Sequence, residues 1–98
     1  MTQIGDLVLD ATAHRVCVDG VTVPLTPAEF RILAVLCESP GQVFTRSQLL
    51  DRLSDGGSIY ERTLDRHINN LRKKIEPNPR EPQYVQTVYG VGYCVRRP

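Results

Sequence analysis

The hydrophobic positions near the start of the chain fall in short stretches separated by turn residues, which is the pattern of β-strands. Residues 7–9 are a candidate strand, residues 14–18 alternate polar and apolar side chains only loosely, and residues 21–23 follow as the return strand. Asp19-Gly20 separates the last two stretches and is the strongest short-range signal for a hairpin turn. Pro24 limits the final strand to an edge or an end of a sheet. The first 26 residues therefore predict a small antiparallel sheet.

Two helices follow, and each begins with a capping box, in which a Thr side chain and a Glu or Gln side chain three positions later bind each other's backbone N–H groups. The first box pairs Thr26 with Glu29, and Pro27 occupies the first helical position. The second box pairs Thr45 with Gln48. Apolar residues at helical spacing give both helices a buried face: Phe30, Leu33, Ala34 and Cys37 in the first, and Leu49, Leu50 and Leu53 in the second.

A third helix is predicted over residues 58–75, and its two faces differ in character. One face is an apolar seam with the spacing i, i+4, i+7 and i+11, made of Leu64, Ile68, Leu71 and Ile75. Ser58 and Glu61 have the spacing of another capping box at its start. The opposite face is polar and basic, and consists of Thr63, Arg66, His67, Asn70, Lys73 and Lys74.

The polar face of this third helix has two interpretations. A solvated surface over a core is the ordinary explanation for a charged helix. However, the segment from Arg62 to Lys74 holds five basic residues and one acid, which leaves few of the opposite-charge pairs that stabilise surface helices. Asn and Thr side chains can also contact base edges. Together with the short preceding helix and the Gly-containing connection at 54–57, this favours a helix-turn-helix whose third helix enters the DNA major groove.

The chain after this helix predicts a β-hairpin. Residues 77–82 contain three prolines and form a stiff connector. Residues 84–88 alternate as a strand, and residues 93–96 return as a second strand. The turn between them, residues 89–92, contains Gly90 and Gly92, which can both take positive φ. A hairpin directly after a recognition helix, here about residues 84–97, is the wing of a winged helix. The predicted fold class is therefore α+β, with an N-terminal antiparallel sheet, three helices and a C-terminal hairpin in one domain of residues 1–98.

Charge is unevenly distributed along the chain. The net charge is only +1, but residues 46–98 hold ten basic and six acidic residues, whereas residues 1–45 hold two and five. Positive potential is thus concentrated in the second half. No apolar run is long enough for a membrane, and the three widely spaced cysteines match no zinc pattern and fit a reducing cytoplasm. No catalytic Ser/His/Asp or Cys/His arrangement or Gly-rich phosphate loop occurs, so we expect neither an enzyme nor a cofactor.

Four sequence blocks occur in a characteristic order and spacing: LTPAEF with Leu33, PGQVFTR with Leu49 and Leu50, RTLDRHI followed by LRKKI, and TVYGVGY. With these blocks the whole chain resembles the C-terminal effector domain of OmpR/PhoB-type bacterial response regulators. The resemblance implies a four-stranded N-terminal sheet, where the hydrophobic pattern gives about three strands. It also implies regulation of transcription by binding direct-repeat promoter DNA as a head-to-tail dimer.

The resemblance further implies partners outside these 98 residues. A receiver domain, phosphorylated by a sensor kinase, would control the effector domain, and Met1 would mark a domain boundary. We expect the isolated domain to be a monomer in solution. The family's loop between the second and third helices can contact RNA polymerase, but the corresponding loop here, residues 54–57, is short, which weakens this expectation.

Roles for individual residues also come from the resemblance. The implied base-reading residues are Thr63, Arg66 and Asn70. The implied phosphate contacts are Arg46, Arg62, His67, Arg72, Lys73 and Tyr93. The wing residues are Thr87, Tyr89 and Gly90, while Asn69 and Lys74 flank the reading face. Alternatives stay open for two of them: Arg72 could pair with Asp65 or a neighbouring acid, and His67 could be an ordinary helix residue; Asp65 itself is expected to be structural.

Tyr89 departs from the family pattern, because many members have at this point an arginine that enters the minor groove. We expect this wing to contribute less to affinity and to A/T preference than is usual. A second class of function also stays open, in which the basic helix meets an acidic protein. Salt dependence distinguishes the two, since binding to phosphates weakens steeply as salt rises.

Overall fold

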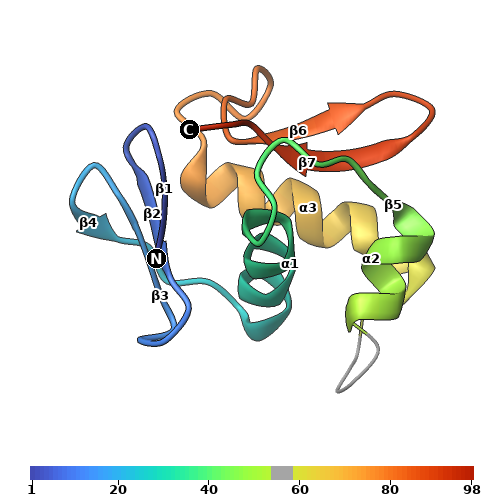
Figure 1. Ribbon diagram of the computed structural model, residues 1–98, viewed down its shortest axis with the longest axis horizontal. Helices are drawn as coiled ribbons and strands as arrows, with labels where there is room; N and C mark the ends of the chain where they lie inside the picture. The colour runs from blue at the N-terminus through green and yellow to red at the C-terminus, as the bar shows by residue number, and fades with distance from the viewer. Residues whose placement is uncertain (54–58) are drawn as a thin grey trace.

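The computed structural model describes residues 1–53 and 59–98 and has an N-terminal sheet, three helices and a C-terminal hairpin, as predicted (Figure 1). The elements follow in the order β1 (Thr2–Ile4), β2 (Leu7–Asp10), β3 (Arg15–Val18), β4 (Val21–Thr22), α1 (Pro27–Cys37), β5 (Phe44–Thr45), α2 (Arg46–Leu53), α3 (Glu61–Ile75), β6 (Val85–Val88) and β7 (Gly92–Val95). The predicted loop at 54–57 lies outside the described residues.

The N-terminal sheet is an antiparallel meander of β1, β2, β3 and β4 in that order. The strand that the resemblance added is β1. Asp19 and Gly20, with φ of 52° and 77°, form the predicted hairpin turn between β3 and β4. β3 begins at Arg15 instead of residue 14, because His14 has a φ of 56° that a strand does not adopt. The inner face of the N-terminal sheet buries Ile4, Leu7, Leu9 and Val16.

Both predicted capping boxes of the first two helices are present. Thr26 N–H donates to Glu29 Oε1 at 3.0 Å, and Glu29 N–H donates to Thr26 Oγ1 at 3.2 Å. Thr45 N–H donates to Gln48 Oε1 at 2.9 Å, and Gln48 N–H donates to Thr45 Oγ1 at 3.0 Å. The two helices and α3 pack around one core with the inner face of the N-terminal sheet.

α3 begins at Glu61, three residues later than predicted, and Ser58, the predicted cap, lies outside the described residues. Tyr60 takes the cap position in an extended conformation, and Thr63 Oγ1 accepts its backbone N–H at 3.0 Å. Thr63 therefore provides a local bond at the start of the helix, whereas the capping box of Ser58 and Glu61 stays a prediction. The predicted apolar seam is confirmed, because Leu64, Ile68, Leu71 and Ile75 are all at most 2% exposed.

A second sheet joins β5, β7 and β6, in that order. The pattern of the sequence did not predict β5, whose two residues pair with the last strand, Phe44 with Tyr93 and Thr45 with Gly92. In the turn of the hairpin, Gly90 has the predicted positive φ of 78°, but Gly92 does not. Gly92 is required for a different reason, since a Cβ on it would lie 1.9 Å from Phe44 O.

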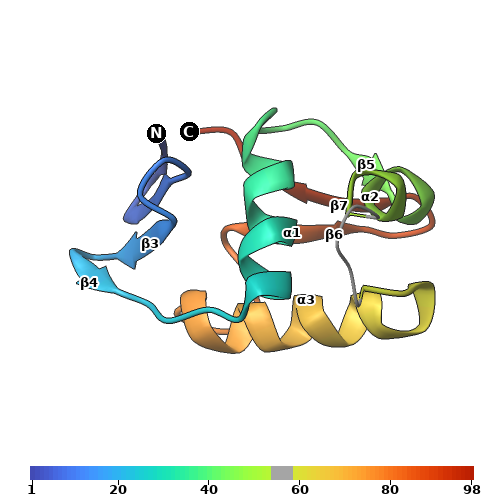
Figure 2. The same ribbon diagram turned by 90° about the horizontal axis from the view of Figure 1, so that it is seen from below.

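The packing of α1 and α2 against α3 leaves one side of α3 uncovered. In Figure 2 the described part of the molecule places α3 along the lower edge, with α1 above it and the hairpin of β6 and β7 extending to the side. The seam faces α1 and the core, so the polar face of α3 points outward beside the hairpin.

Candidate nucleic-acid interface

The outward face of α3 carries the predicted base-reading residues and three of the predicted phosphate contacts, Arg62, His67 and Lys73. Arg62, Arg66 and Lys73 are exposed, while Thr63, His67 and Asn70 are half-buried. A hollow of about 430 Å³ lies between this face and the start of α1, lined by residues 26–29, Arg66, His67 and Asn70. The Thr63 hydroxyl is already bonded to the Tyr60 backbone, so the Thr63 methyl group is the part left for a ligand.

Lys74, at the edge of the face, turns to α1. Its Nζ lies 2.6 Å from Glu29 Oε1, and the Glu29 side chain is only 3% exposed. Burial alone raises the pKa of Glu29, but hydrogen bonds from Lys74 and Thr26, with the Lys74 charge, outweigh it and lower that pKa below 4.5. Glu29 therefore caps α1 and ties α3 to it, and Lys74 is a weaker candidate for a DNA contact.

Arg46, Asp65 and Tyr93 meet where α2, α3 and β7 converge. Arg46 forms an ion pair with Asp65 Oδ1, and the Tyr93 hydroxyl donates to the same oxygen at 2.5 Å. Arg46 Nη2 also donates to Glu61 O at 3.1 Å. The expected structural role of Asp65 agrees with this arrangement. Two residues predicted to contact phosphates, Arg46 and Tyr93, thus share a partner within the protein.

Arg72 differs from its predicted role as a phosphate contact. Its side chain is 9% exposed, and it donates from Nε to Val85 O at 3.0 Å and from Nη2 to Thr87 Oγ1 at 2.7 Å. Its guanidinium also lies over the Tyr93 ring, 5.7 Å from the centroid. The alternative of an internal contact is the better description, although its partners are β6 and Tyr93 and not an acid. Arg72 fastens the hairpin to α3.

Glu76 is a structural residue that the sequence pattern did not single out. Its buried carboxylate, just after α3, accepts the backbone N–H groups of Gln83 at 2.7 Å, Tyr84 at 3.1 Å and Val85 at 2.8 Å. It satisfies donors at the start of β6 that burial would otherwise leave unpaired. An acid directly before a proline connector was the available signal, but it did not identify these partners.

The tip of the hairpin projects from the domain. Tyr89 is 91% exposed and Gly90 is exposed, whereas Thr87 is half-buried and bonded to Arg72. A hollow of about 340 Å³ lies between the hairpin and α2, lined by Arg46 and residues 87–93. The three predicted wing residues therefore divide between an exposed tip and an anchored base.

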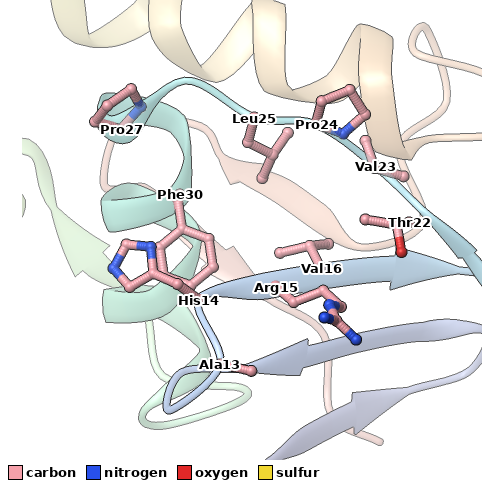
Figure 3. Close-up of a pocket in the computed structure, with 10 residues that line it drawn as sticks. All are labelled: Ala13, His14, Arg15, Val16, Thr22, Val23, Pro24, Leu25, Pro27 and Phe30. Atoms are coloured by element: carbon pink, nitrogen blue, oxygen red, sulfur yellow. The ribbon is translucent and has the colours of Figure 1, made fainter.

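A separate hollow of about 430 Å³ lies between β3, β4 and the start of α1 (Figure 3). His14 is exposed and stacks on Phe30 with ring centroids 4.1 Å apart. The described lining holds no acid or thiol beside His14 that would form a catalytic group. Burial raises the pKa of the Cys37 thiol to about 12 and also raises that of Cys94, so both are poor nucleophiles.

Two other classes of site are absent from residues 1–53 and 59–98. None of the helices there is long and apolar enough to cross a membrane. The same residues include no cluster of His, Cys, Asp or Glu side chains suited to a metal ion.

Comparison with known proteins gave consistent matches. Residues 20–95 match the family described as "Transcriptional regulatory protein, C terminal". Over 88 residues the chain is 44% identical to the transcriptional regulatory protein BaeR of Escherichia coli O6:H1, a match that covers 89% of this chain and 37% of BaeR. It is 45% identical over 97 residues to the phosphate regulon transcriptional regulatory protein PhoB of Rhizobium meliloti, covering 97% of this chain and 42% of PhoB. The chain thus spans about two fifths of the length of these curated relatives.

Solved structures agree with the sequence matches. The response regulator DrrB of Thermotoga maritima, an OmpR/PhoB homologue, superposes with a TM-score of 0.87 at 38% identity, over 97% of this chain and 43% of DrrB. The RstA DNA-binding domain of Klebsiella pneumoniae, solved in complex with the RstA box, superposes with a TM-score of 0.83 at 33% identity, over 96% of this chain and 94% of that domain. The chain belongs to the C-terminal domain family of transcriptional regulatory proteins, of the OmpR/PhoB response-regulator type.

Proposed function

We propose that this domain binds double-stranded promoter DNA in a sequence-specific manner and so regulates transcription, with α3 in the major groove and the tip of the hairpin near the adjacent minor groove. The observation that carries the proposal is the uncovered, predominantly basic face of α3 beside a projecting hairpin. The solved complex of the similar RstA domain with the RstA box supports it.

Three residues of α3 are proposed to read bases. Arg66 and Asn70 carry the donors that pair with guanine and adenine, and Thr63 offers its methyl group to a thymine methyl. The proposed phosphate contacts are Arg46, Arg62, His67 and Lys73, which position the domain without reading sequence. Arg72 and Tyr93 are not included in that set, because Arg72 is buried against β6 and the Tyr93 hydroxyl donates to Asp65.

The wider setting is proposed from the relatives. In a longer protein, a receiver domain and a cognate sensor kinase would control this domain, and tandem copies would occupy direct repeats on DNA in the cytoplasm. RNA polymerase is a further proposed partner. In this setting the domain is a binding module without catalysis, and it needs no cofactor.

The first experiment is a fluorescence-anisotropy titration against a randomised duplex pool at several salt concentrations, followed by sequencing of the bound fraction. Three or four phosphate contacts predict that log K falls with log salt at a slope of about −3, and we expect an enriched direct repeat. A shallow slope without enrichment would instead support the alternative of an acidic protein partner.

Variants then separate reading from positioning. Asn70→Ala should cost about 1–3 kcal/mol on the enriched sequence and much less on random DNA, whereas Lys73→Ala should weaken both alike. Tyr89→Ala should cost less than Asn70→Ala, because tyrosine brings no positive charge to the minor groove. Arg52→Ala is the matched control, since Arg52 pairs with Glu38 between α1 and α2. Equal losses on specific and random DNA for Asn70→Ala would contradict the assignment of Asn70.

A further inference from the structure

Asp65 is an acid close to the surface that the proposed function turns towards DNA. It lies on α3 between Thr63 and Arg66, and half of its side chain is exposed. A carboxylate near a phosphate backbone is repelled, so an acid at this place needs a physical explanation.

The contacts of Asp65 join three elements. Its Oδ1 accepts from Arg46 at the start of α2 and from the Tyr93 hydroxyl of β7, the latter at 2.5 Å. The hydrogen bond from Arg46 is the largest cause that lowers the pKa of Asp65 below its usual range, and the hydrogen bond from Tyr93 is the second. The carboxylate is therefore ionised at neutral pH. The negative charge is therefore available to fix the direction of the Arg46 guanidinium.

Arg46 keeps donors for a second partner. A guanidinium carries five N–H groups. In the part of the chain that the structure describes, Arg46 bonds only Asp65 and Glu61 O, through one terminal nitrogen each. Its side chain is 39% exposed, and it lines the hollow of about 340 Å³ between α2 and the hairpin. The remaining N–H groups can therefore donate to an anion that enters from solvent.

We propose that Asp65 is a positioning residue that directs Arg46 towards one DNA phosphate seated between α2 and the hairpin, and that Tyr93 acts through Asp65 and not by contacting phosphate. This inference rests on the proposed DNA-binding function and adds a defined binding site for one phosphodiester group. Arginine suits this site because its fork can bond a carboxylate and a phosphate at the same time from a fixed orientation.

The proposal reverses the effect that charge alone predicts. If Asp65 acted only through its charge, then Asp65→Asn would strengthen DNA binding by removing a repulsion. If Asp65 orients Arg46, the same substitution weakens binding, because the guanidinium loses the partner that holds it. The sign of the change therefore separates the two accounts.

The test measures the affinity of Asp65→Asn for the enriched duplex by fluorescence anisotropy across a salt series. We expect binding about tenfold weaker than that of the wild type, which is the effect of one charge-assisted hydrogen bond. The slope of log K against log salt should become shallower by about 0.9, the contribution of one phosphate. A purely structural role of Asp65 would lower the melting temperature but would not remove one phosphate from the slope.

Glu61→Gln is the matched control, because it removes the same charge one turn earlier on α3, where the side chain is exposed. It should leave affinity unchanged or raise it. Tyr93→Phe, alone and combined with Arg46→Ala, tests whether Tyr93 acts on Arg46 through Asp65, and it leaves the charge of Asp65 unchanged. Tyr93→Phe alone should weaken binding about threefold, as expected for one hydrogen bond, and should add nothing when Arg46 is absent.

Several results would overturn the inference. Tighter or unchanged binding by Asp65→Asn would do so, and so would additive losses for Tyr93→Phe and Arg46→Ala. Should Asp65→Asn fail to fold, the cycle of Tyr93→Phe and Arg46→Ala decides alone. Wild-type binding is measured first: its absence would overturn the proposed function together with this inference, whereas normal wild-type binding with tighter binding by Asp65→Asn would overturn the inference alone.

Discussion

Replacing Gly92 with alanine would introduce a Cβ at 1.9 Å from Phe44 O and 2.9 Å from both Phe44 C and Thr45 Cα. Ordinary van der Waals contact begins at 3.4 Å, and all three obstacles are backbone atoms of the paired strand β5. Side-chain rotation cannot relieve this overlap. Strands β5 and β7 must therefore move apart by more than an ångström, which breaks their pairing.

The cost follows from what that pairing holds. Each backbone hydrogen bond contributes about 0.5–1.5 kcal/mol, and overpacking a tight site costs about 1–3 kcal/mol more. Phe44 and Tyr93, opposite each other in the register, are both buried and would lose contacts. We expect Gly92→Ala to lower the free energy of unfolding by about 2–4 kcal/mol. DNA affinity should fall as well, because Tyr93 would shift away from Asp65.

Urea unfolding followed by far-ultraviolet circular dichroism measures this change, since the chain has no tryptophan. Gly90→Ala is the matched control: its φ is 78°, but an added Cβ would meet nothing within 4 Å. Backbone strain alone should then cost about 1 kcal/mol. If Gly92→Ala destabilised the protein no more than Gly90→Ala, the argument from close backbone approach would be refuted.

Two further predictions concern buried acids. Glu76→Gln should lower the free energy of unfolding by about 2–3 kcal/mol, because an amide N–H would face the backbone N–H groups at the start of β6. The control is Glu81→Gln at an exposed position, which in urea unfolding should stay within about 0.5 kcal/mol of the wild type. Equal losses of stability for the two variants would contradict the contacts assigned to Glu76. The pKa of Glu29 is lowered from 4.5, so its stabilising effect is fully present above pH 4.5 and is lost as the pH falls through the lower folded value. The stability difference between the wild type and Glu29→Gln should narrow on acidification in a urea series, and a constant difference would argue against the Lys74 pair.

Local patterns in the sequence predicted those parts of the fold that local chemistry determines. The capping boxes at Thr26 and Thr45 and the turn at Asp19-Gly20 depend on residues within three positions of each other. The seam of α3 depends only on helical period. These features could be read without knowing what lies opposite them.

Features that depend on distant backbone atoms could not be predicted in this way. Arg72 has the charge of a phosphate contact, but it lies between the polar face and the seam and meets Val85 O, which no spacing reveals. β5 has only two residues and shows no period of its own, and it is defined by its pairing with β7. The DNA contacts of the helix residues stay a prediction from the family resemblance, whereas the contacts that anchor the wing were not predicted at all.

The hairpin is attached to α3 along the length of that helix: Asp65 holds Tyr93, Arg72 holds Val85 and Thr87, and Glu76 holds the start of β6. Such attachment fixes the angle and distance between the reading helix and the wing tip. Under the proposed function, α3 in the major groove and the wing tip near the minor groove then keep a fixed separation, and neither contact can adjust without the other. DNA that does not match must bend or twist, and the energy of that deformation depends on base steps that no side chain touches. Part of the sequence preference would then be set by the stiffness of the DNA.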